Sequence, residues 1–283
     1  FVLLAPVLFL PLAPTQAASS SPSDPPPVSW THLSTINGDL PAPSASRLQT
    51  AALIFDIDKD GVNDFVIASQ REVGAAVVWY QRQASGWTKH LIDDSVLFIE
   101  AGGASHDIDS DGDLDLILGG DRSSNQIWWW ENPYPNYEPN QGWTRRLIKD
   151  SGASKHHDQI FADIDGDGQA ELVFWNQRGT ALLLAEIPAD PRTSGPWPAT
   201  PIYTWRDGAE HEGLAQADID GDGKIDLVGG GRWFKHEGGT VFTPQVIDDQ
   251  NRFSRVAVGQ LKPGGRPEVV LGAGDVDGPL KWY

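Results

Sequence analysis

A nine-residue acidic motif occurs four times in this chain and constrains its fold more than any other feature. The copies cover residues 56–64 (DIDKDGVND), 107–115 (DIDSDGDLD), 163–171 (DIDGDGQAE) and 218–226 (DIDGDGKID). Each carries carboxylates at positions 1, 3, 5 and 9 and a glycine at position 6. Alternate carboxylates on a tight turn converge on one point and form a cage of oxygens, which suits Ca²⁺. The glycine supplies the unusual backbone angle that the turn requires.

The motif therefore predicts four calcium sites, the alternative being acidic turns that are merely solvated. It resembles an EF-hand loop, but the closing acid stands at position 9 rather than 12, and the flanks are short β-like runs instead of helices. The predicted ligands are Asp56, Asp58, Asp60, Asp64, Asp107, Asp109, Asp111, Asp115, Asp163, Asp165, Asp167, Glu171, Asp218, Asp220, Asp222 and Asp226.

The copies recur at a regular period. Their first residues are 56, 107, 163 and 218, so the spacings are 51, 56 and 55 residues. Each unit contains four apolar strand-like runs, and a fifth unit follows whose loop (GQLKPGGRPE, 259–268) lacks the acids at the motif positions and is expected to hold no calcium. Four-stranded units repeated around an axis form a β-propeller, whereas a linear β-solenoid usually has a shorter period. The sequence predicts an all-β propeller.

The motif and its period resemble the FG-GAP/VCBS repeat family, which includes integrin-α-type propellers, over residues 28–283. The resemblance implies that each acidic loop joins the innermost strand of a blade to the second strand, that the Trp-rich run is third and that the run beginning Trp-Thr is outermost. Residues 28–36 would then form an outermost strand. The third strand of the fifth unit ends at Tyr283, where the others continue. This favours a truncated seven-bladed propeller over a complete five-bladed one.

Composition and the first residues suggest where the protein works. The apolar run 1–18 ends in Thr-Gln-Ala and resembles a secretory signal, while 19–27 is a Ser/Pro-rich linker. A transmembrane anchor is the weaker reading because the run is short and contains three prolines. We therefore expect a monomer, secreted or periplasmic, without membrane insertion. The net charge is −18, which four Ca²⁺ ions would change to −10, and it counts against nucleic-acid binding.

Polar residues recur seven positions before each loop. If the loops lie at one end of the blades, the innermost strands begin at the other, which we call the mouth. Histidine acts as acid or base near neutral pH, so the three mouth histidines are candidate catalytic residues; with carboxylates they could also hold Zn²⁺. The alternative is hydrogen bonding between blades. The candidates are His156, His157 and His211 for catalysis, and Glu100, Glu210, Glu212 and Arg252 for substrate binding.

Arginines form a second set, fourteen or fifteen residues after each loop begins. Arg71, Arg122, Arg178 and Arg232 would lie at turns of the mouth. Guanidinium groups bind carboxylate or sulfate, so the set predicts a platform for an anionic ligand; pairing with acidic neighbours is the alternative. Trp175 ends a second strand near the mouth, where its ring could stack on a sugar. The other tryptophans are expected mainly to pack blade against blade.

Two functions of different class follow. Several propellers similar to this one are polysaccharide lyases or sugar dehydratases, so the resemblance implies β-elimination on a uronate-containing sugar. That reaction needs a base, a cation for the carboxylate and an acid, which the histidines and arginines could supply. The alternative is a non-catalytic propeller that binds a glycan or a protein. The density of His and Glu at the mouth favours the enzyme, because binding alone does not require it.

Overall fold

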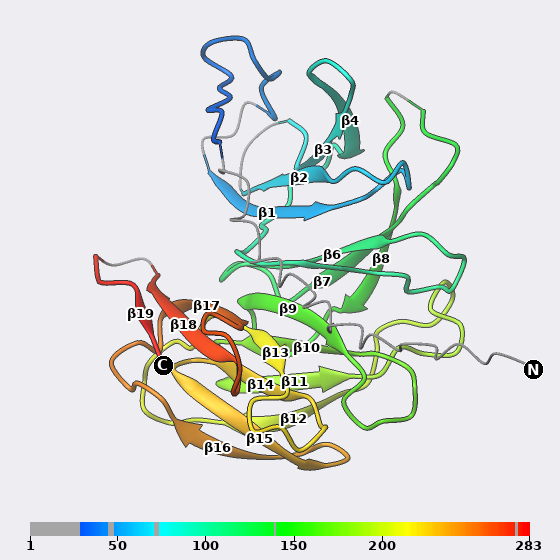
Figure 1. Cartoon of the computed structure of the whole chain (residues 1–283). Helices are drawn as coiled ribbons and strands as arrows, with labels where there is room; N and C mark the ends of the chain where they lie inside the picture. Colours follow the sequence, from blue (N-terminus) through cyan, green and yellow to red (C-terminus); the bar gives the residue numbers. More distant parts are fainter. Residues whose placement is uncertain (1–28, 45–47, 71–73, 139, 275–276) are drawn as a thin grey trace, which may run out of the picture.

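The computed structural model describes residues 29–44, 48–70, 74–138, 140–274 and 277–283. The predicted signal segment, the linker and Arg71 lie outside the described residues. Within them the regular structure is entirely strand, in five antiparallel sheets (Figure 1). No helix in these ranges has the length and apolar character needed to cross a bilayer.

Each sheet is one blade, and its strands follow in chain order. Blade one contains β1 (Gln49–Phe55), β2 (Asp64–Ser69), β3 (Val77–Arg82) and β4 (Trp87–Asp93). Blade two contains β5 (Ala104–His106), β6 (Asp115–Gly119), β7 (Ile127–Glu131) and β8 (Thr144–Lys149). Blade three contains β9 (His156–Ala162), β10 (Glu171–Asn176), β11 (Ala181–Ala185) and β12 (Ala199–Thr204).

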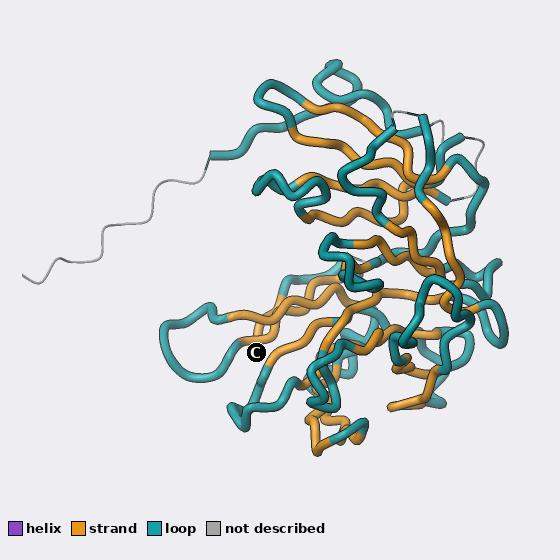
Figure 2. Tube along the Cα trace, turned by 90° about the vertical axis from the view of Figure 1, so that its right-hand side faces the viewer, coloured by secondary structure: helices purple, strands orange, loops and turns teal. Residues whose placement is uncertain are grey.

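The last two blades follow the same order. Blade four contains β13 (Ala215–Ala217), β14 (Asp226–Gly229), β15 (Arg232–Gly238) and β16 (Val241–Val246). Blade five has three strands in the described residues, β17 (Ser254–Gly259), β18 (Glu268–Ala273) and β19 (Lys281–Trp282). The blades follow one another along an arc (Figures 1 and 2). This confirms the predicted all-β propeller of repeated blades, while the expectation of seven blades stays a prediction.

The blade boundaries differ from the sequence repeats by one strand. The outermost run of each repeat pairs with the third strand of the preceding repeat, as β4 pairs with β3 and β16 with β15. The strand predicted at 28–36 is wrong: the described part, 29–36, has no regular strand and enters a turn at 35–38. The segment 29–36 precedes the first blade, so the described residues contain no preceding third strand with which it could pair. Its Trp30 is 91% exposed.

The core lies between consecutive blades. The second strands of blades two and three, β6 and β10, are buried along their whole length because blades cover both of their faces. Large aromatic side chains fill each interface. The interfaces join Phe55 and Trp79 to Trp128 and Trp130, then Trp129 to Phe174 and Trp197, then Trp175 and Trp205 to Phe234. The predicted packing role of most tryptophans is therefore confirmed.

Candidate functional site

The four acidic motifs form the same turn, and each connects the first strand of a blade to the second. We call them loops one to four (56–64, 107–115, 163–171 and 218–226). The residues at positions 4 and 6 have left-handed backbone, with φ of 59° to 84° and 87° to 97°. Within each loop the position-6 glycine donates its backbone N–H to the first carboxylate, at 2.9 Å from Gly61 to Asp56 and from Gly223 to Asp218. These turns fold the side chains inward.

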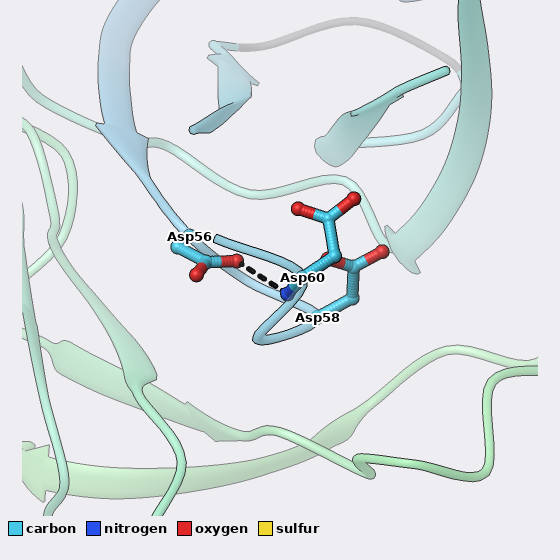
Figure 3. Close-up of side chains that lie close together, drawn as sticks. All are labelled: Asp56, Asp58 and Asp60. Atoms are coloured by element: carbon cyan, nitrogen blue, oxygen red, sulfur yellow. Dashed lines mark hydrogen bonds between the residues drawn. The ribbon is translucent and has the colours of Figure 1, made fainter. Parts of the chain in front are cut away.

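Three carboxylates of each loop converge. In every group one oxygen from each residue lies within 4.8 Å of the others, and Figure 3 shows the first group on its turn. The groups are Asp56, Asp58 and Asp60; Asp107, Asp109 and Asp111; Asp163, Asp165 and Glu171; and Asp218, Asp220 and Asp226. The other predicted ligands, Asp64, Asp115, Asp167 and Asp222, stand outside these groups. Each loop therefore presents a three-carboxylate site suited to a metal ion.

The carboxylates of the loops fit a hard cation. Oxygens of Asp64, Asp107 and Glu171 are buried and have no hydrogen-bond partner among the described residues. Burial raises the pKa of Asp64 to about 6 and that of Glu171 to about 7, so each ionised carboxylate needs a positive charge nearby. An ion with oxygen ligands supplies that charge without a defined donor geometry.

The ninth carboxylate has a structural role in loops one, two and four. Asp226 accepts the N–H of Ile219 at 3.0 Å and that of His236, on the third strand, at 2.8 Å. Asp115 likewise accepts from Ile108 and from Asn132, just after β7. This residue connects the loop to the third strand of its blade.

All three candidate catalytic histidines are buried, and two of them lie among the packed side chains of the blade interfaces. His156 begins β9 and is 0% exposed; burial and the Lys149 ammonium, 3.2 Å from its Nε2, lower its pKa to about 3. His211 is also fully buried, with its ring stacked on Trp205 at 4.3 Å between centroids. Burial and the nearby Arg232 guanidinium lower the pKa of His211 to about 4. Both side chains are neutral at pH 7 and have no exposed surface.

His157 belongs to a charged group that joins three blades. Its Nδ1 lies 2.6 Å from Asp158 Oδ2, and its Nε2 lies 3.3 Å from Glu212 Oε1. Arg255 of blade five donates to the other oxygen of Glu212 at 3.0 Å. Burial opposes the charge of His157, but Asp158, Glu212 and Glu100 outweigh it and raise the pKa. We call Asp158, His157, Glu212 and Arg255 the channel cluster.

The arginines divide into two pairs. Arg232 and Arg252 form ion pairs with Asp207, at 3.9 Å and 2.7 Å. For these two arginines the structure agrees with the alternative that they pair with acidic neighbours. Arg122 and Arg178 are exposed and make no ion pair with any described residue. Ser154 joins their turns, because its hydroxyl donates to the Arg122 carbonyl at 3.0 Å and its carbonyl accepts the Arg178 N–H at 3.4 Å. These two side chains therefore stand on adjoining turns of the mouth.

The remaining predicted mouth residues are paired or buried. Glu210 accepts from Lys155 at 2.5 Å, and a Glu100 oxygen accepts the N–H of Ala101. Trp175 is 0% exposed; its ring contacts Trp205, His211 and Phe234 and its N–H donates to Gly213. A ring in that place has no face for a sugar.

The predicted zinc site finds no counterpart in the described part of the chain. The side-chain groups there that could hold a metal ion are the four in the acidic loops, and the mouth contributes none. Both nitrogens of His157 already face carboxylates.

Sequence reasoning missed two residues of the mouth, Asp207 and Arg255. Asp158 follows the two histidines directly and belongs to the same dense acid–base run, but the sequence assigned it no role of its own. Arg255 comes near His157 and Glu212 because β17 packs beside β13. The sequence around Arg255 carries no signal of this contact between blades.

Comparisons with known proteins agree with this geometry. The family model of the FG-GAP-like repeat matches residues 107–174 and 163–229, which hold loops two to four. A comparison with curated protein sequences found no match. Among solved structures, an Agrocybe aegerita lectin reported to recognise non-reducing terminal N-acetylglucosamine is 20% identical, with a TM-score of 0.54, and covers 83% of this chain.

Two other solved structures are more distant. The V. cholerae biofilm matrix protein Bap1 is 14% identical with a TM-score of 0.46, over 79% of this chain. The rhamnogalacturonan lyase YesW is 13% identical with a TM-score of 0.47, over 86%. This chain spans 66% of the lectin, 35% of Bap1 and 51% of YesW, less than two thirds of each.

Proposed function

Since this chain is an FG-GAP repeat β-propeller, we propose that it is a calcium-stabilised binding module for an anionic carbohydrate, acting outside the cell. The observation that carries this proposal is the pair of exposed arginines, Arg122 and Arg178, on adjoining turns of a protein whose net charge is −18; neither makes an ion pair within the described ranges. The four acidic loops support the calcium part, because all of their converging donors are carboxylate oxygens.

The choice of ligand rests on chemistry. Guanidinium forks bind carboxylate and sulfate groups in a bidentate manner. Arg122 and Arg178 project from adjoining turns, so one chain of acidic sugars can contact both. The likeness to a lectin makes saccharides the ligand class to test first.

Binding without turnover agrees better with the burial of the histidines. A general base must reach its substrate, and neither His156 nor His211 has exposed surface. Their lowered pKa values also make them weak bases at neutral pH.

The second candidate function is the polysaccharide lyase, and one observation favours it. The channel cluster combines an acid–base group, His157, with a cation, the partly exposed Arg255. In β-elimination a base removes the proton α to the uronate carboxylate, the C–O bond breaks, and the leaving oxygen takes up a proton. Within the cluster, His157 would take the α proton and return it to the leaving oxygen, and Arg255 would neutralise the carboxylate. Because His157 is 2% exposed, side chains around it would have to move for a substrate to reach it.

Calcium binding is tested by titration calorimetry and by melting with and without a chelator. Ions that bind only the folded state stabilise it by about 2.7 kcal/mol per site at a hundred times the dissociation constant. We expect up to four bound ions and a lower melting temperature in chelator. An unchanged melting temperature and no binding heat would refute the calcium sites.

Ligand binding is tested with polygalacturonate and alginate, and with chitin oligosaccharides as neutral comparators. Arg122→Ala and Arg178→Ala should weaken binding to the uronate polymers, whereas Arg266→Ala, an exposed arginine in the turn between β17 and β18 at the opposite end of the blades, should not. Equal binding by all three variants would count against the arginine face. Unsaturated product from either polymer, abolished by His157→Gln, would establish the lyase instead.

A further inference from the structure

A cleft of 660 Å³ lies between blades three and four, at the end of the blades that carries the acidic loops. Asp163 and Asp165 of loop three line one side. Gln216 of β13, Lys224 of loop four and His236 of β15 line the other parts. The volume suits a small ligand, since such sites usually measure about 300–1,000 Å³.

The cleft is open because the covering segment found at the preceding interfaces is missing here. The connection between β7 and β8 reaches loop one, where Asn132 and Tyr137 donate to the Ile57 carbonyl at 3.1 Å and 3.0 Å. The connection between β11 and β12 reaches loop two, where Arg192 pairs with Asp109 at 2.7 Å and Asp111 at 2.9 Å.

The corresponding connection of blade four is too short to cover loop three. Only residues 239–240 join β15 to β16, whereas 132–143 and 186–198 form the other two connections. As a result Asp163 and Asp165 are exposed, while the first two carboxylates of the other loops are half-buried. Loop three therefore faces an open cleft.

His236 gives an independent sign that this cleft takes a ligand. The side chain lines the cleft yet is only 5% exposed, and its ring stacks on Phe242. Its Nε2 lies 2.8 Å from the Gly239 carbonyl and therefore carries the proton. Nδ1 is then an acceptor, and it has no partner among the described residues. A buried acceptor left unpaired costs about 1–3 kcal/mol, which a ligand donor would recover.

The lining determines the class of ligand. Its acceptors are the two loop-three carboxylates and His236 Nδ1, and its one cation, Lys224, already donates to the Glu237 carbonyl at 3.2 Å. Glu186 adds a further negative charge beside Asp165 and Asp167. Even with a divalent ion in loop three, the carboxylates of the loop and Glu186 leave a net negative charge, so an anion is repelled. A neutral molecule with several hydroxyl donors satisfies His236 Nδ1 and the carboxylate oxygens that the ion leaves free. We propose that this cleft binds a neutral, hydroxyl-rich ligand, a saccharide residue, separately from the arginine face.

The test measures binding of neutral sugars to the whole chain in the presence of calcium. The probes are glucose, galactose, mannose and N-acetylglucosamine, each as the reducing sugar and as its methyl glycoside, which separates free sugars from residues of a glycan. Isothermal titration gives the affinity, and amide NMR shifts give the location. We expect at least one sugar to bind and to shift the amides of Gly166, Gly238 and Gly239.

Two variants and a matched control decide the location. Gln216→Trp fills the cleft from an exposed strand position, and His236→Phe removes the acceptor but keeps an aromatic ring. Each should weaken binding at least tenfold, while Gln250→Trp, between β16 and β17, should not change it. If Gln216→Trp does not fold, His236→Phe and the NMR map still decide. Binding that survives both variants, or no sugar bound at 10 mM (about the weakest affinity of interest), overturns the inference. Retained uronate binding then leaves the proposed function standing.

Discussion

Acid should destabilise this protein through His156 and His211, by an amount that follows from their burial. An unfolded histidine takes up a proton near pH 6.5, whereas these two keep pKa values of about 3 and 4 in the folded chain. Between these limits the unfolded state binds more protons, so stability falls as the pH falls. Each pH unit below 6.5 costs about 1.4 kcal/mol per histidine. Because an unfolded histidine is already half protonated at pH 6.5, the loss from pH 6.5 to 5.0 is about 1.6 kcal/mol for each, or about 3 kcal/mol together.

The charged groups beside the two histidines keep their ionisation state between pH 6.5 and 5.0. Lys149, beside His156, has its pKa lowered by burial to about 8 and stays protonated from pH 6.5 to 5.0. Although burial alone would raise the pKa of Asp207, beside His211, hydrogen bonds from Ala209, Arg252 and His211 lower it to about 2, so Asp207 stays ionised. The loop carboxylates are common to every variant compared, and the assay contains saturating calcium so that the proposed calcium sites keep them ionised.

The assay is urea unfolding followed by tryptophan fluorescence, at half-unit steps from pH 5.0 to 6.5. His156→Gln and His211→Gln should each make stability less dependent on pH, by about 1.4 kcal/mol per unit. His32→Gln, at an exposed position, controls for the substitution itself. Proton NMR of the folded protein gives a second measurement. Equal slopes in all variants, or folded-state titration of either histidine near pH 6.5, would refute the burial argument and restore both as candidate bases.

Three further changes test the packing and the loops by urea unfolding. Trp175→Ala should cost about 3–5 kcal/mol, because it empties a fully buried site between blades three and four; a loss below 1 kcal/mol would contradict the burial. Asp226→Asn should cost roughly 1–3 kcal/mol and remove one calcium ion from the titration, since its two oxygens hold Ile219 and His236. Gly102→Ala should destabilise by more than about 1 kcal/mol, because φ is +95° and the added Cβ would lie 2.5 Å from Asp158 Cα; wild-type stability would show that blades two and three separate easily there.

The architecture could be predicted because its determinants are local. The acidic motif recurs at one place in the repeat, so it fixes where a first strand ends and a second begins; Asp115 and Glu171 do begin β6 and β10. Counting back from the loops placed His156 at the start of β9, which is where the structure has it.

The direction of the side chains could not be predicted, because it depends on packing between blades. His156 and His157 are adjacent on one strand, so they point to opposite faces: the first meets Lys149 of blade two, and the second meets Glu212 before blade four. The same reason explains Trp175, whose ring enters the interface with blade four instead of the mouth. The length of the connection between the third and fourth strands is a signal in the sequence that could have been used. The long connections 132–143 and 186–198 cover the acidic loop of the preceding blade, whereas the short connection 239–240 leaves it open.

The bond from the ninth carboxylate of loops one, two and four to the region of the third strand has a consequence for how such a chain can grow. In blade four, Asp226 holds loop four to His236, and the two residues lie in one continuous stretch of sequence, 215–246. The donors, the acceptors and the turn glycines of a blade are all encoded in one stretch. A duplicated stretch therefore carries the hydrogen bonds that hold its acidic loop to its third strand. A propeller of this type can gain a blade without new contacts of that kind having to arise elsewhere in the chain. The connection between the third and fourth strands is then free to lengthen or shorten, which is where the blades of this protein differ most.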